Sequence, residues 1–200
     1  MSVPACDIDS RNAGAQRPPP ELARPHIRLH GQVDDSMLSA FLEGLARVEE
    51  DDGPLVLELT TAGGDAEVGR RIASDVRQFR ARAGRATIFH GKASVYSAGV
   101  TIMSGFRPAE RWLTEDCMLL IHCRRLDKTL TLKGSLNAER AKVEALLAEI
   151  DAGLQLQAYD FGSLVQDTGV GLDELLQRAE HDWYVAASEA VRRGLVAGLT

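Results

Sequence analysis

Short apolar runs alternate with amphipathic segments along this chain, and the alternation restricts its fold more than any other feature. Residues 26–33, 54–61 and 85–91 are rich in branched or alternating apolar residues, which is typical of strands. Residues 34–53 and 66–84 follow the first two runs and have the apolar spacing of helices. Strands that alternate with helices predict an α/β protein in which loops at the strand ends are available for chemistry.

The same reasoning extends to the second half of the chain. The expected elements there are a helix over 91–105, a strand within 107–125, a long amphipathic helix over 136–156, and two shorter helices within 171–196 that separate near His181–Tyr184. In the long helix, Leu146, Leu147 and Ile150 are predicted to face inward.

Size and charge limit the classes of function. Two hundred residues can form one domain with a proper core, and a net charge of −6 argues against a general nucleic-acid binder, which needs a basic face. No apolar run approaches the roughly 18–20 residues needed to cross a bilayer, and residues 1–25 lack the apolar stretch of a secretory signal. We therefore expect a flexible arm at 1–25, one domain at 26–200, a cytoplasmic location, and neither nucleic-acid nor membrane partners.

The cysteines do not form a recognisable site. Cys6, Cys117 and Cys123 are too few and too unevenly spaced for a disulfide framework or a zinc site, so no metal is expected. Cys123 follows His122 directly, which would suit a reactive thiol, but the role of a small buried hydrophobic residue is favoured.

Three sequence features suggest parts of one chemical site. Gly63 and Gly64 end a strand and let backbone N–H groups approach a ligand closely. Ser97 lies where a helix is expected to start, and His122 ends the apolar run "CMLLIH". Serine needs a base to act as a nucleophile, and a histidine can accept and return a proton near neutral pH.

Two further residues would complete such a site. A carboxylate is needed to orient the histidine, and Asp182 in "EHDWYVAA" is our choice. The N–H of Ala98, directly after Ser97, would stabilise an oxyanion. Residue types alone leave simpler roles open: a helix cap for Ser97 and for Asp182, a core histidine for His122, and an ordinary turn at the glycines. The pattern G-x-S-x-G is absent because Val95 occupies the first glycine position, which argues against an ordinary α/β-hydrolase.

The order of these motifs resembles the proteolytic subunits of the ATP-dependent Clp protease, a family of serine peptidases. The resemblance runs from about Ile27 to the C-terminus. It is carried by the glycine turn "TTAGGD", by "FHGKASVYSAGVTIMSG" around the serine, by "CMLLIHC", and by "EHDWYVAASEAVRRGLV". The 25 residues from Ser97 to His122 (122 − 97) also match the spacing expected for that family.

The resemblance implies a ClpP/crotonase-like ββα spiral fold and a serine endopeptidase that acts without metal or organic cofactor. It assigns Ser97 as nucleophile, His122 as general base, Asp182 as the third member of the triad, and the amides of Gly64 and Ala98 as oxyanion donors. It also implies homo-oligomeric rings that enclose a chamber, unfolded polypeptides as substrate, and an AAA+ unfoldase as partner. The sequence departs from the family in "TTAGG", in "HCRR" after the strand, and in a longer stretch between His122 and Asp182, the part of the family that joins the rings.

Three other interpretations remain. The same fold occurs in crotonase-type acyl-CoA enzymes, and "AGGDAEVG" resembles a loop of that family. A crotonase-type activity would, however, leave Ser97 and His122 without a role. A serine–lysine peptidase could use Lys92, Lys128 or Lys133 as a desolvated base. A non-catalytic ring subunit is the third, and a complete Ser-His-Asp set argues against it.

Overall fold

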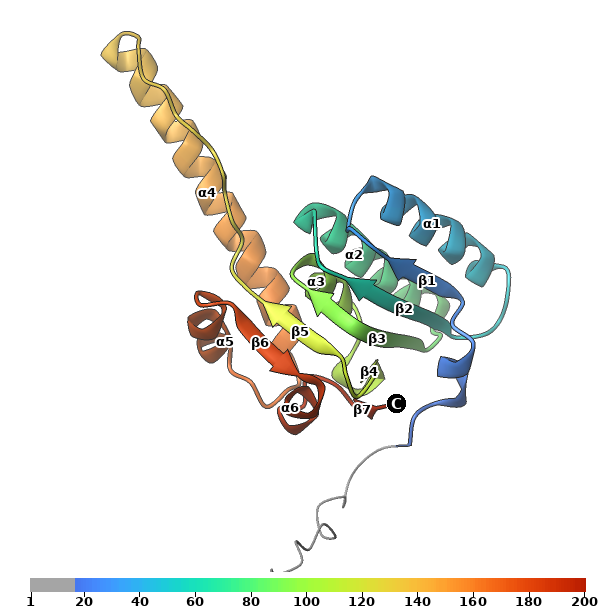
Figure 1. Ribbon diagram of the computed structural model, residues 1–200. Coiled ribbons are helices and arrows are strands. Elements are labelled where there is room, and N and C mark those ends of the chain that lie inside the picture. Colours follow the sequence, from blue (N-terminus) through green and yellow to red (C-terminus); the bar gives the residue numbers. More distant parts are fainter. Residues whose placement is uncertain (1–16) are drawn as a thin grey trace, which may run out of the picture.

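Seven strands pair into one sheet in the computed structural model, which describes residues 17–200 (Figure 1). The strands are β1 (Ile27–His30), β2 (Leu55–Thr61), β3 (Thr87–Tyr96), β4 (Arg111–Leu113), β5 (Met118–Ile121), β6 (Trp183–Ala186) and β7 (Gly198–Leu199). The order is β1-β2-β3-β4-β7, and the long strand β3 also pairs with β5, which pairs with β6. Only the β5–β6 pairing is antiparallel among these described strands. The predicted α/β class is confirmed.

Six α-helices connect these strands. They are α1 (Asp35–Glu49), α2 (Ala66–Ala83), α3 (Ala98–Met103), α4 (Leu136–Val165), α5 (Leu172–Ala179) and α6 (Ala187–Arg192), with short 3-10 turns η1 (Pro20–Ala23) and η2 (Pro108–Glu110). Helices α1 and α2 begin where Asp34 and Asp65 accept hydrogen bonds from backbone N–H groups of the first turn. Both helices lie close to the limits predicted from their apolar spacing.

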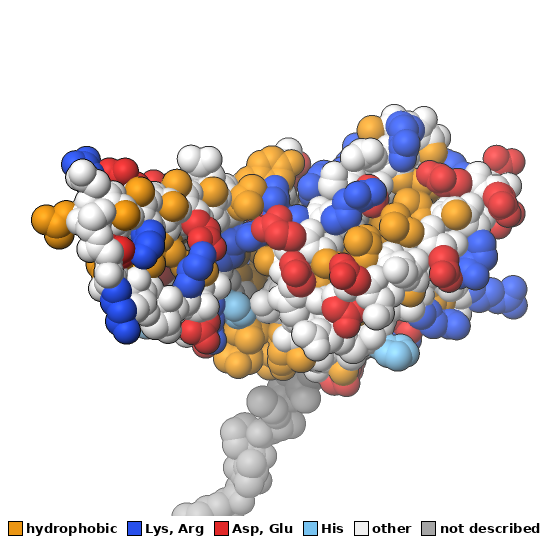
Figure 2. Space-filling model, turned by 90° about the horizontal axis from the view of Figure 1, so that it is seen from above, with side chains coloured by type: hydrophobic (Ala, Val, Ile, Leu, Met, Phe, Trp, Pro, Cys, Tyr) orange, Lys and Arg blue, Asp and Glu red, His pale blue; other side chains and the backbone are white. Residues whose placement is uncertain are grey.

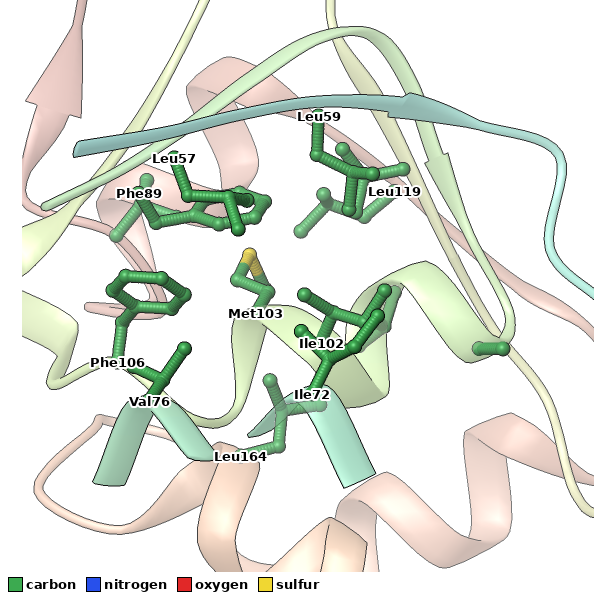
Figure 3. Packing of buried hydrophobic residues seen from close by; sticks show 14 of the residues in the cluster. Leu57, Leu59, Ile72, Val76, Phe89, Ile102, Met103, Phe106, Leu119 and Leu164 are labelled. Carbon is green, nitrogen blue, oxygen red and sulfur yellow. The ribbon is translucent and has the colours of Figure 1, made fainter. Parts of the chain in front are cut away.

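The core lies between the sheet and the helices on one of its faces. In Figure 3, side chains of β2 and β3 point down onto Ile102 and Met103 of α3, and Ile72 of α2 and Leu164 of α4 lie on the far side. Helix α3 is therefore enclosed by the sheet and two helices, which explains why nearly all of its residues are buried. The start of α3 is held in place by this buried packing.

One predicted boundary in the second half is wrong. The helix expected over 91–105 begins only at Ala98, because β3 continues to Tyr96 and pairs with β5 through residues 94–96. The predicted separation of two short helices near His181–Tyr184 is confirmed, but the strand β6 between them, whose Trp183 pairs with Ile121 of β5, was not predicted. In both cases pairing with a distant strand decided the conformation.

Helix α4 is longer than predicted and its N-terminal half extends away from the rest of the protein (Figure 1). Leu147 and Ile150 are 54% and 38% exposed, so the prediction that they face inward is wrong. The chain between β5 and α4 runs back along this helix, and Lys128 forms an ion pair with Glu149 there. Only the C-terminal part of α4 packs against the domain.

The N-terminal side of the domain includes part of the predicted arm. Leu22 in η1 is buried in a second apolar cluster with Val56, Ile88 and Trp112. Residues 1–16, where most of the predicted arm falls, lie outside the described residues. None of the helices within 17–200 is both long and apolar enough to cross a membrane.

Charged side chains are mixed on the surface. On the face drawn in Figure 2, Lys and Arg side chains are interspersed with Asp and Glu instead of gathering into one basic patch.

Candidate active site

One cavity of about 270 Å³ brings together four of the five predicted site residues. Ser97, His122, Gly64 and Ala98 all line it, although they come from three separate segments of the chain. Asp182 does not line it. The other lining residues are Ala66, Val100, Thr101, Ile121, Arg124, Arg125, Gln157, Asp160, Phe161 and Leu164.

Ser97 occupies a sharp turn between β3 and α3. Its φ angle is 54°, a conformation that residues other than glycine seldom adopt, and its N–H donates to the Leu120 carbonyl at 2.8 Å. Its side chain does not cap α3, so the simple structural role considered for this serine is not used. Strained backbone of this kind is costly, and it is found most often at functional sites.

Gly63 and Gly64 pass directly beside this turn. Both have positive φ angles, 104° and 149°. A Cβ on Gly63 would lie 2.7 Å from the Ser97 Cβ, and a Cβ on Gly64 would lie 2.3 Å from the Val33 carbonyl oxygen. Gly63 therefore has to be glycine for the loop to pass this close to Ser97, and Gly64 for it to pass this close to Val33.

Two backbone amides next to the serine are unpaired. Within residues 17–200, neither the Gly64 N–H nor the Ala98 N–H donates a hydrogen bond. The loop around Gly64 is nevertheless held, because Val33 N–H donates to Gly63 at 2.9 Å and Asp65 N–H donates to Val33 at 2.8 Å. Unpaired, firmly held N–H groups at a cavity wall are suited to bind an oxygen that gains negative charge.

His122 follows the last residue of β5 and enters the cavity from that strand end. Its Nδ1 lies 2.7 Å from the Cys123 carbonyl oxygen, so Nδ1 carries the proton and donates it. That tautomer leaves Nε2 as a proton acceptor. No hydrogen bond joins His122 to Ser97 in the described part of the chain, although both residues line the same cavity.

Asp182 directly precedes β6, the strand that pairs with β5, after which His122 stands. The antiparallel ladder between β5 and β6 ends at the pair Ile121 and Trp183, and the residues next beyond that pair are His122 and Asp182. The Asp182 carboxylate accepts two hydrogen bonds from Arg125, at 2.7 and 2.9 Å. The predicted third triad member thus lies one residue beyond the end of the ladder, as the histidine does, and is bound to an arginine.

Sequence reasoning missed an ionic network on the other wall of the cavity. Asp160 of α4 is 7% exposed and accepts hydrogen bonds from Arg70 at 3.0 Å and from Arg124 at 3.2 Å. Burial raises the pKa of the Asp160 carboxyl and outweighs the two arginines, which lower it. Glu67 binds the same two arginines. Partial burial raises the pKa of the Glu67 carboxyl, but the hydrogen bonds from Arg124 and Arg70 outweigh burial, so that this pKa is lowered. No local pattern links Arg124 to Asp160, which lies 36 residues further along the chain.

The nearby thiol has little nucleophilic character. Burial, with the neighbouring acids Glu180 and Asp182, raises the pKa of the Cys123 thiol. Protonated thiols are poor nucleophiles. Cys123 is only partly buried, although it packs against the main apolar cluster, so the structure supports its packing role but not the burial expected from the sequence.

The three lysines considered as an alternative base lie elsewhere. None of Lys92, Lys128 and Lys133 lines the cavity. Lys92 is 2.6 Å from Glu58, and Lys128 is paired with Glu149. The geometry offers no support for a serine–lysine peptidase.

A comparison with known protein families gives a match to most of the chain. A family model described as Clp protease matches residues 21–200. The match includes the glycine turn, the strained serine turn, the strand-end histidine and Asp182.

Proposed function

Because the chain belongs to the Clp protease family, we propose that it is a serine endopeptidase that cleaves unfolded polypeptides through an acyl-enzyme at Ser97. One observation carries the proposal. Ser97 and His122 come from different strand ends, and both line one cavity together with Gly64 and Ala98. A nucleophile, a base and two oxyanion donors are the groups that acyl transfer requires.

In the proposed reaction, the Ser97 hydroxyl attacks the carbonyl carbon of the scissile peptide bond while His122 Nε2 accepts its proton. The carbonyl oxygen becomes an oxyanion that the Gly64 and Ala98 N–H groups stabilise. The C–N bond then breaks, and His122 returns the proton to the leaving amine. Water, deprotonated by the same imidazole, attacks the acyl-enzyme and releases the second product with the Ser97 hydroxyl restored.

Asp182 would orient the imidazole and stabilise its charged form during these steps. The ladder between β5 and β6 supports this role, because its last pair, Ile121 and Trp183, is directly followed by His122 and directly preceded by Asp182. The proposed role requires the carboxylate to turn from Arg125 to the histidine.

Assembly into a homo-oligomeric ring is part of the proposal. Apolar side chains are exposed along α4 and the segment before it, namely Leu126, Leu130, Leu132, Leu136, Leu147, Ile150 and Leu154. Contiguous exposed apolar surface of this kind marks interaction sites. An AAA+ unfoldase would deliver substrates to the chamber, and ATP would be consumed by that partner.

Two alternatives make different predictions about the purified chain. A crotonase-type enzyme would turn over an enoyl-CoA substrate, and a non-catalytic ring subunit would do no covalent chemistry. We favour neither alternative, because both leave the strained Ser97 turn and the His122 side chain in the cavity without a role.

Labelling with a fluorophosphonate probe tests the proposed nucleophile. The Ser97 oxygen attacks phosphorus and displaces fluoride, so the wild-type chain should carry a stable adduct. We expect no adduct in Ser97→Ala. Ser94→Ala is the matched control: it changes a partly buried serine of β3 outside the cavity and should label at the wild-type rate. Equal labelling of Ser97→Ala and wild type would refute Ser97 as the nucleophile.

A further inference from the structure

Arg125 touches both parts of the proposed triad: it binds Asp182, and it lines the cavity of Ser97 and His122. Its guanidinium group binds both oxygens of Asp182, at 2.7 and 2.9 Å. The same residue lines the cavity that contains Ser97 and His122. The carboxylate expected on the histidine is therefore engaged by a neighbour of that histidine in the sequence.

The histidine has a substitute partner as well. Its Nδ1–H donates to the Cys123 carbonyl, the position that a carboxylate oxygen would take in a Ser-His-Asp arrangement. A carbonyl can hold the same tautomer, but it lacks the negative charge that stabilises an imidazolium ion. Both sides of the missing His122–Asp182 contact are thus satisfied by other groups.

We propose that Arg125 is a positioning residue that competes with His122 for the Asp182 carboxylate and thereby lowers the rate at which Ser97 is acylated. The proposal rests on the proposed function in taking Ser97 and His122 as nucleophile and base. When Arg125 releases Asp182, the carboxylate is proposed to replace the Cys123 carbonyl at Nδ1, because His122 directly follows and Asp182 directly precedes the last pair of the β5–β6 ladder, Ile121 and Trp183.

The exposure of the ion pair makes this release easy. The Arg125 side chain is 70% exposed and that of Asp182 is 43% exposed. Ion pairs of this kind contribute little and are weakened by salt. Arg124, by contrast, is 24% exposed and is held by both Glu67 and Asp160. Of two consecutive arginines, the second is the one that can move.

The surroundings of His122 contain charges from several elements. Arg124 and Arg125 lie on the segment after β5, Asp160 lies on α4, and Glu180 and Asp182 lie between α5 and β6. Asp160 already binds Arg70 and Arg124, and it cannot turn to the histidine without breaking both contacts. Asp182 is therefore the carboxylate that Arg125 controls.

The rate of fluorophosphonate labelling measures the competition in the full-length chain. We expect Arg125→Gln to label about 1.5- to 5-fold faster than wild type, the size expected for loss of an exposed ion pair. Both contacts come from one guanidinium nitrogen, so Arg125→Lys, which keeps the charge and one donor nitrogen, should label closer to wild type than Arg125→Gln does. Raising the ionic strength should accelerate labelling of the wild type but not of Arg125→Gln.

Two controls separate the proposal from a general effect on structure. In an Asp182→Asn background, Arg125→Gln should give no further acceleration, since the carboxylate is gone. Arg178→Gln removes another arginine near Asp182 that is paired with Glu174, and it should label like wild type. An equal acceleration with and without the Asp182 carboxylate, or no acceleration in Arg125→Gln, would overturn the competition.

Crystal structures of Ser97→Ala and of Ser97→Ala/Arg125→Gln give a readout that does not depend on peptidase activity. We expect an Asp182 oxygen within hydrogen-bonding distance of His122 Nδ1 only in the second chain. Retention of the Cys123 contact in both chains would overturn the proposal, as would an Asp182–His122 contact in both. Failure of the proposed function would instead show as labelling that persists in Ser97→Ala, whatever these structures contain.

Discussion

Replacement of Gly64 by alanine is expected to reduce fluorophosphonate labelling of Ser97 by about a hundredfold or more, the cost of losing one oxyanion donor. The added Cβ would lie 2.3 Å from the Val33 carbonyl oxygen and 2.8 Å from the Val33 nitrogen. Both are backbone atoms, so the loop that carries the Gly64 N–H has to move. The φ angle of 149° adds strain for any side chain.

Gly31→Ala is the control for this prediction. Gly31 also has a positive φ, 95°, but a Cβ there meets nothing within 4 Å. It tests backbone strain without the collision at Val33, and labelling should stay close to the wild-type rate. A Gly64→Ala chain that labels as fast as Gly31→Ala would contradict the placement of an oxyanion donor at Gly64.

Replacement of Arg111 by methionine is expected to lower the free energy of unfolding by about 3–5 kcal/mol. Arg111 is fully buried, and it donates hydrogen bonds of 2.7–3.1 Å to the carbonyl oxygens of Phe106, Leu164 and Leu195. Burial lowers its pKa to about 9, so it remains charged at neutral pH. Methionine would fill most of the space but leave three buried carbonyls without donors.

Urea unfolding followed by circular dichroism checks this expectation. Arg111→Lys keeps a charge but reaches fewer carbonyls, so its stability should be intermediate. Arg28→Met is the control, because Arg28 is exposed on β1 and its ion pair with Glu58 is long, 3.8 Å; the expected loss is below about 1 kcal/mol. Similar midpoints for Arg111→Met and Arg28→Met would show that the three carbonyls do not depend on this guanidinium.

The elements predicted from the sequence are those whose structure follows from their own residues. The apolar stripe of α2, for example Val68, Ile72 and Val76, is buried as its spacing predicts. The limits of β3 and the existence of β6 were missed because they depend on pairing with β5. The N-terminal half of α4 lacks the inward face that its spacing predicts at Leu147 and Ile150, because spacing shows which side of a helix is apolar and not whether anything packs against it.

The candidate site was predictable in its parts but not in its contacts. Gly64 and His122 follow strands that the apolar runs predict, whereas Ser97 follows the end of β3, which they do not predict; the fold brings all three to one cavity. The bond between Arg125 and Asp182 joins residues 57 positions apart, and no local rule predicts it. A buried arginine such as Arg111 was also unpredictable, because arginine is usually exposed.

The most direct test of the account is the site at which a peptidyl chloromethyl ketone reacts. Attack of the Ser97 oxygen on the ketone would hold the reagent, and His122 Nε2 would then displace chloride and form a C–N bond. The account predicts, by mass spectrometry, a peptide adduct on His122 in the wild type. In Ser97→Ala, alkylation of His122 should fall to the level of the exposed His181. An adduct on Cys123 instead, or equal alkylation of His122 with and without the Ser97 hydroxyl, would contradict it.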